Sequence, residues 1–118
     1  MQEAFVQEKL ELLRRSKFRG SFKLSDKDRA YLAVKGLATI RLHAAEFVRA
    51  RLAPADPARD GKQTPFRGHP VFTAQHATAT CCRTCMAKWH GVAVGQELTS
   101  DECELAVNLI AGWLDGQL

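Results

Sequence analysis

The chain has 118 residues, a formal net charge of +4, 46% hydrophobic residues and 25% charged residues. This composition is that of an ordinary globular protein, and the length predicts a single domain over residues 1–118. No apolar stretch is long enough to span a membrane, and the acidic, amphipathic N-terminus is unlike a secretion signal. We therefore expect a cytoplasmic protein whose cysteines stay reduced.

The charge is distributed unevenly along the chain. Residues 1–88 contain 17 basic and 8 acidic side chains, whereas residues 89–118 contain five acids and no lysine or arginine. The densest basic run consists of Arg14, Arg15, Lys17, Arg19 and Lys23. Such a run is a candidate nucleic-acid-binding surface. The alternative is a solvated face whose charge balances the acidic C-terminal segment.

Apolar residues recur at helical spacing along most of the chain. They predict helices over residues 3–15 and over 26–35 after the N-cap Ser25, continuing to about residue 52 with a pause at Gly36. Residues 53–70 contain four prolines and two glycines, and predict a long irregular loop that is mobile or is held by something it binds. Pro70 starts one helix or two broken segments up to residue 90, and a capping box at Thr99 starts the last helix. The expected fold is a compact all-α domain with four or five helices.

The segment from residue 69 to residue 90 contains three of the four histidines and three of the four cysteines. Thiolate and imidazole are favoured zinc ligands, and the spacing of Cys82 and Cys85 is that of a zinc knuckle. The candidate metal ligands are Cys82, Cys85, His90 and His76, with Cys81, His69 and His43 as alternates. Zinc is the expected cofactor, although the same residue types also bind iron.

A purely structural interpretation of the cysteines stays open. In an unbroken helix, Cys82, Cys85, Met86 and Trp89 lie on one face, as in an ordinary core stripe. Buried cysteine behaves as a small hydrophobic residue, so such a stripe needs no metal.

Thiol chemistry is the third interpretation of this segment. A cysteine near a helix N-terminus and beside Arg83 has a lowered pKa, and its thiolate is a nucleophile. The candidate catalytic residues are Cys81 or Cys82 with His76 as the neighbouring base. No third residue that would orient the histidine is evident from the sequence.

A candidate anion site precedes the cysteines. Arg67, His69 and Gln75 lie at the end of the long loop and in the first turns of the next helix. A helix N-terminus with basic residues nearby suits a phosphate-bearing ligand. The alternative is that Arg67 and His69 tie the loop to backbone carbonyl groups.

Several short strings of residues carry a family resemblance. They are SKFR (16–19), LSDKDR (24–29), DGKQTP (60–65), RGHPVF (67–72), AQHATATCCRTC (74–85) and KWH (88–90). From about residue 11 onward, the chain resembles a family of small bacterial proteins catalogued as domain of unknown function 4186. The resemblance implies a stand-alone domain, and it brings no assigned activity, substrate or ligand set.

Together these features predict a small cytoplasmic binding or regulatory module. In this interpretation the Cys/His cluster holds structural zinc, and residues 14–23 contact nucleic acid. The alternative is a small enzyme that uses a Cys/His pair, or a hydrolase with an open metal site. Four protein ligands favour the structural role, whereas three protein ligands and a water favour catalysis.

Overall fold

The computed structural model of the chain describes residues 2–118. Within this range it contains six α-helices, a 3-10 segment, a π-helical segment and no strand, so the all-α class is confirmed. The elements are α1 (Gln2–Arg15), η1 (Arg19–Ser21), α2 (Asp26–Lys35), α3 (Leu37–Phe47), η2 (Val48–Leu52), α4 (Pro70–Ala77), α5 (Arg83–His90) and α6 (Ser100–Asp115). The helix count exceeds the predicted four or five because two of the expected helices are interrupted.

The two interruptions have different backbone causes. Gly36 separates α2 from α3 with φ +86°, a conformation that glycine adopts without steric strain. Between α4 and α5 the chain leaves the helix at Thr78, and Ala79 has φ +57°. A left-handed alanine is disfavoured, so the sequence contains no local signal for this second break. Of the two alternatives for residues 71–90, the two broken segments are therefore confirmed and the unbroken helix is wrong.

Side chains cap the N-termini of four helices among the described residues. Ser25 caps α2 and Thr99 forms a capping box with Glu102 at the start of α6, as the sequence predicts. His69 caps α4 through its ring, directly before the predicted first residue of that helix. Cys82 caps α5 by accepting a hydrogen bond from the backbone of residue 85. His69 and Cys82 thus lie at helix starts, where backbone amide groups donate hydrogen bonds to their side chains.

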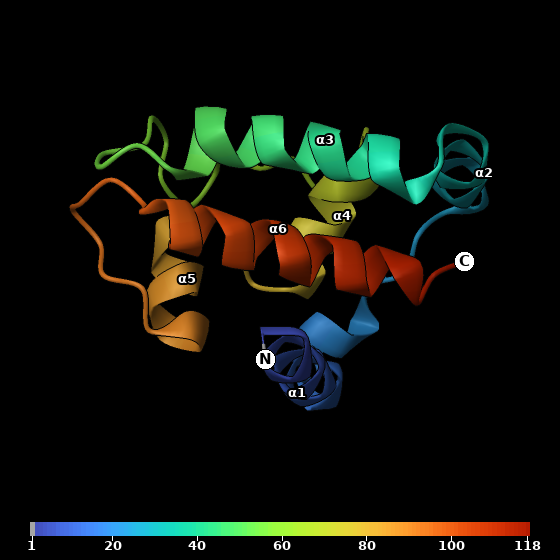
Figure 1. Cartoon of the computed structure of the whole chain (residues 1–118), viewed down its shortest axis with the longest axis horizontal. Helices are drawn as coiled ribbons and strands as arrows, with labels where there is room; N and C mark the ends of the chain where they lie inside the picture. The colour runs from blue at the N-terminus through green and yellow to red at the C-terminus, as the bar shows by residue number, and fades with distance from the viewer. Residues whose placement is uncertain (1) are drawn as a thin grey trace.

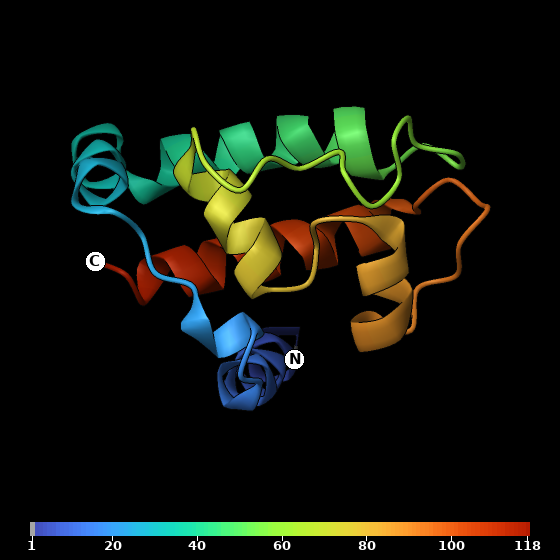
Figure 2. The same cartoon turned by 180° about the vertical axis from the view of Figure 1, so that it is seen from behind.

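Helix α6 is the centre of the packing. It runs alongside α3 down the length of the molecule, while α1 and α4 pack on it from other sides (Figure 1). All six α-helices contribute buried apolar side chains to the core, including Leu10, Leu32, Ile40, Val71, Met86 and Ile110. Seen from behind, the loop between η2 and α4 runs along α3 before it enters α4 (Figure 2). No helix of residues 2–118 combines the length and the apolar character that a membrane crossing requires.

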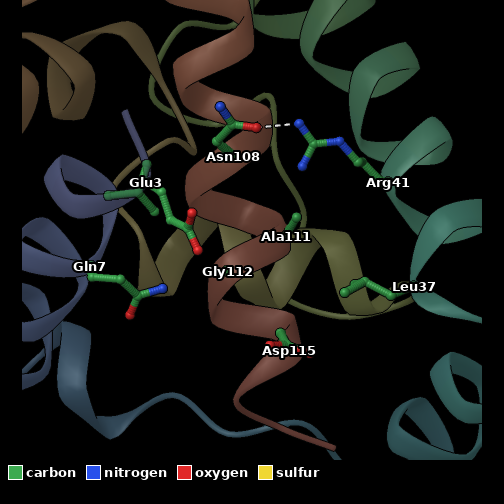
Figure 3. Close-up of a pocket in the computed structure, with 9 residues that line it drawn as sticks. Glu3, Gln7, Leu37, Arg41, Asn108, Ala111, Gly112 and Asp115 are labelled. Atoms are coloured by element: carbon green, nitrogen blue, oxygen red, sulfur yellow. Dashed lines mark hydrogen bonds between the residues drawn. The ribbon is translucent and has the colours of Figure 1, made fainter. Parts of the chain in front are cut away.

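Gly112 allows α1 to approach α6 closely. A Cβ atom at this position would lie 2.9 Å from Cδ1 of Leu10 and 3.4 Å from Cγ1 of Val6. Beside this contact, an open cavity of about 370 Å³ separates α1, α3 and α6, and a hydrogen bond from Arg41 to Asn108 crosses it (Figure 3). The cavity is lined by none of the candidate site residues, so we regard it as a gap in the packing of the three helices.

We expect Gly112→Val to lower the free energy of unfolding by about 1–3 kcal/mol, because the added methyl groups overlap the buried Leu10 and Val6. Urea denaturation measures this change. The matched control is Ala4→Val on the exposed side of α1, which loses only a few tenths of a kcal/mol through helix propensity. Equal losses for the two variants would contradict the close α1–α6 contact.

Candidate metal centre

Three cysteines converge where α5 begins. The Sγ atoms of Cys81, Cys82 and Cys85 all lie within 4.8 Å of one another. The N-cap geometry produces this arrangement, because Cys82 Sγ accepts a hydrogen bond from the Cys85 amide at 3.4 Å. Cys81 and Cys82 are buried and Cys85 is half-buried. Within residues 2–118, no histidine or carboxylate joins this cluster.

A buried arginine from η1 faces the three sulfurs. Arg19 donates from Nη2 to Cys85 Sγ at 3.0 Å and from Nη1 to Cys81 Sγ at 3.7 Å. The same Nη1 donates to the His76 carbonyl at 2.7 Å, which fixes the guanidinium in place. Arg19 belongs to the basic run proposed as a nucleic-acid surface, but its side chain is turned inward to the sulfurs. The other members of that run, Arg14, Arg15, Lys17 and Lys23, are exposed.

The cluster concentrates negative charge on one sulfur. Hydrogen bonds from Cys81 and Cys82 lower the pKa of Cys85 well below its usual range, and the Arg19 guanidinium lowers it further. Hydrogen bonds to Cys82 and Cys85, together with burial, raise the pKa of Cys81. The directions of these shifts make Cys85 the most acidic thiol of the cluster, whereas the sequence pointed to Cys81 or Cys82 as the nucleophile.

His76 is not paired with a thiol. Its ring stacks on Phe66 with 3.9 Å between ring centroids, and its Nε2 lies 3.0 Å from the Thr64 carbonyl oxygen. Burial lowers the pKa of His76 and the Thr64 carbonyl opposes this shift. The Cys81/His76 and Cys82/His76 pairs expected for catalysis make no hydrogen bond in the described part of the chain.

His90 has one ring nitrogen in a state suited to metal binding. Its Nε2 lies 2.8 Å from the Thr78 carbonyl oxygen, so this nitrogen carries the proton and donates it. Its Nδ1 is buried and has no hydrogen-bond partner among the described residues. Burial lowers the pKa of His90, and the hydrogen bond to the Thr78 carbonyl opposes this shift. A histidine held by a carbonyl with its other nitrogen unprotonated is the usual form of a metal ligand.

The alternate histidines form a separate pair. His43 Nδ1 lies 3.1 Å from His69 Nε2, and His69 Nδ1 accepts the Val71 amide proton at 3.0 Å. His69 therefore carries its proton on Nε2 and donates it to His43. Because both nitrogens of His69 are used, His69 serves the start of α4.

The expected anion site is not assembled. Gln75 is fully buried and donates to the Thr80 carbonyl at 3.0 Å, so its amide is not presented to an external ligand. His69 faces His43, and Arg67 is exposed on the loop. Of the three residues, only Arg67 offers an accessible donor.

The long loop is held by the chain itself. Thr64 Oγ1 donates to the Cys81 carbonyl at 2.7 Å, and this bond is buried. Asp60 Oδ1 accepts the Arg83 amide proton at 3.1 Å and so caps α5 from outside. Both residues belong to the string DGKQTP that contributes to the family resemblance. Internal contacts, rather than a bound ligand, thus fix the loop against the thiols.

Arg83 has a role that the sequence did not indicate. Its guanidinium points away from the thiols and is 2% exposed. It donates to five backbone carbonyl groups, namely those of Leu52, Ala53, Pro54, Ala93 and Gln96. The positive charge near the thiolate comes from Arg19 instead. The sequence signal for Arg19 was its place in SKFR, one of the strings that accompany the cysteine segment in the family resemblance.

We expect Arg83→Met to lower the free energy of unfolding by roughly 3–5 kcal/mol, because several buried carbonyl groups lose their donor. Urea denaturation followed by circular dichroism measures the change. Lys88→Met, at an exposed position of the same helix, is the matched control and should change stability by no more than about 0.5 kcal/mol. Similar losses in both variants would contradict the anchoring role.

In metal-free protein, we expect Arg19→Gln to raise the pKa of Cys85, because the thiolate loses a cationic donor. Alkylation of Cys85 by iodoacetamide below neutral pH should then slow down, as mass spectrometry of the labelled peptides will show. The shift should be partial, since the hydrogen bonds from Cys81 and Cys82 remain. Arg14→Gln, at an exposed site, should leave the pH profile unchanged, and an equal effect of both variants would contradict the assignment.

Comparison with known proteins gives a family but no activity. The family model described as Domain of unknown function (DUF4186) matches residues 7–115. This range contains the three clustered cysteines, Arg19 and Arg83. No solved structure matches the chain. The chain belongs to the DUF4186 family.

Proposed function

We propose that this protein is a small metal-binding module in which Cys81, Cys82 and Cys85 hold a zinc ion. The observation that carries the proposal is the mutual distance of the three sulfurs, which stays within 4.8 Å. Zinc–sulfur bonds of about 2.3 Å at tetrahedral angles place sulfur atoms roughly 3.8 Å apart. The cluster is thus close to the size of a zinc site.

The charge of the surroundings also suits zinc. Three thiolates and one divalent cation leave a single net negative charge, which the buried Arg19 guanidinium would balance through its bonds to Cys81 and Cys85. Sulfur ligands favour zinc, copper(I) or iron–sulfur clusters over magnesium or calcium. Because thiolates must remain reduced, we expect the protein to work in a reducing compartment such as the cytoplasm.

For the fourth ligand we propose His90. The support is its buried Nδ1 without a partner and its Nε2 held by the Thr78 carbonyl. His76 is the weaker choice because its ring is stacked on Phe66 and its Nε2 faces the Thr64 carbonyl. Four protein ligands would close the site, and closed zinc sites stabilise structure. We therefore favour a binding or regulatory module over an enzyme.

A bound ion would join three segments of the chain. Cys82 and Cys85 lie at the start of α5. The Cys81 carbonyl accepts a hydrogen bond from Thr64 of the long loop. Arg19 of η1 donates a hydrogen bond to Cys81 Sγ. Metal binding would therefore stabilise the whole junction rather than one helix.

The test is the metal content of protein purified without a histidine tag, measured by elemental mass spectrometry. We expect about one zinc per chain. Cys81→Ser, Cys82→Ser and Cys85→Ser should each reduce the content and lower the melting temperature. Cys103→Ser is the matched control, because Cys103 lies on α6 outside the cluster. His90→Ala should weaken zinc affinity by at least an order of magnitude.

The other results point to other functions. Absence of metal with thiols that react only after unfolding would reduce the cluster to core packing. Absence of metal with fast alkylation of Cys85 in the folded protein would favour thiol chemistry. A water at the fourth position of wild-type protein, together with unchanged zinc affinity in His90→Ala, would favour a hydrolase.

A further inference from the structure

A cleft of about 740 Å³ lies between the segment that follows η1 and the end of the long loop. Its walls come from residues 22–28, from residues 66–68 and from α4, which approach one another on the face seen in Figure 2. Ligand pockets commonly measure roughly 300–1,000 Å³, so this cleft has room for one or two nucleotide units. It does not include the cysteines, so its role is separate from metal binding.

Two aromatic rings line this cleft, the exposed Phe66 and the half-buried Phe22. Phe66 is 59% exposed, yet one face of its ring is stacked on His76 at 3.9 Å. Phe22 lies parallel to Phe66 at 6.4 Å and meets Phe18 edge-on at 5.2 Å. The buried His76 holds the Phe66 ring in a fixed orientation before any ligand arrives. A second planar group can therefore stack on Phe66 with little loss of side-chain entropy.

Free positive charges surround the rings. Lys23, Lys27 and Arg67 line the same cleft, and the only carboxylate in its lining is Asp28. All three cations are exposed. In the part of the chain that the structure describes, none of the three makes an ion pair or a side-chain hydrogen bond. Their charges are available to an anionic ligand.

We propose that this cleft binds single-stranded nucleic acid. A base would stack on the exposed side of Phe66, while Lys23, Lys27 and Arg67 would contact the flanking phosphates. Stacking platforms combined with a basic groove are the usual means of binding single strands without base-specific hydrogen bonds. The exposed Arg14, Arg15 and Lys17 continue the positive charge beyond η1. This extension favours a strand over a free mononucleotide, which would use the cleft alone.

The experiment is fluorescence anisotropy with a labelled oligothymidylate of roughly 12 nucleotides, titrated with the purified full chain at several salt concentrations. Phe66→Ala should weaken binding on the order of ten- to a hundredfold, and Phe66→Trp should retain it. Lys27→Gln with Arg67→Gln should reduce the slope of log affinity against log salt by about 0.7 for each lost phosphate contact. Arg49→Gln with Lys88→Gln removes the same charge elsewhere, from exposed sites outside the cleft lining, and is the matched control.

Circular dichroism and metal content of each variant show whether it is folded, so that a loss of binding is attributed to the cleft. Four outcomes would overturn the proposal. The first is failure of the wild-type protein to bind the oligonucleotide at low salt. The second is binding that Phe66→Ala does not change, and the third is an equal loss of binding in the two charge variants. The fourth is polyglutamate binding as tight as oligonucleotide binding with the same dependence on Phe66, which would assign the cleft to an acidic protein segment.

Discussion

The burial of the Arg83 guanidinium is the constraint on which the arrangement of α5 depends. Its two terminal nitrogens reach the carbonyl groups at the end of η2 and those of the loop before α6. These carbonyl groups lie at or just beyond a helix C-terminus or in an irregular loop, where regular helical hydrogen bonds do not reach them. The Arg83 side chain thus provides hydrogen-bond donors to carbonyl groups of the loop after η2 and of the loop before α6, and it fixes the start of α5 between these loops. Since Cys82 and Cys85 sit on the first turn of α5, the position of the thiols follows from this anchor.

A second arginine, Arg19, provides the positive charge beside the cysteine sulfurs. Arg19 comes from the far end of the sequence and lies against the sulfurs, where its charge stabilises a thiolate at Cys85. A buried guanidinium needs strong hydrogen-bond acceptors, and neutral thiols alone would be poor ones. The arginine and the thiolate therefore stabilise each other. The same charge balance would hold with a divalent ion and three thiolates, so the buried Arg19 is compatible with the metal proposed for this cluster.

Local sequence patterns predicted most helix starts, but they could not predict contacts between residues far apart in the chain. The caps at Ser25 and Thr99 and the first residue of α4 at Pro70 follow from short-range hydrogen bonds that the sequence encodes directly. The break at Ala79 does not, because its left-handed backbone is imposed by the surroundings on a residue that disfavours it. Spacing also identified Cys82 and Cys85 as neighbours. It could not show that Arg19 turns inward, since residues 57 to 66 positions apart meet only in the folded chain.

The thiol cluster and the aromatic cleft are connected through one residue of α4. The His76 ring supports Phe66 in the cleft, and the His76 carbonyl accepts the Arg19 hydrogen bond beside the sulfurs. The positions of both features therefore depend on the position of α4. This helix is held by its packing on α6 and by the N-cap from His69. All eight residues of α4 are buried, because the helix packs against α2, α3, α6 and η1 and has no face left for solvent.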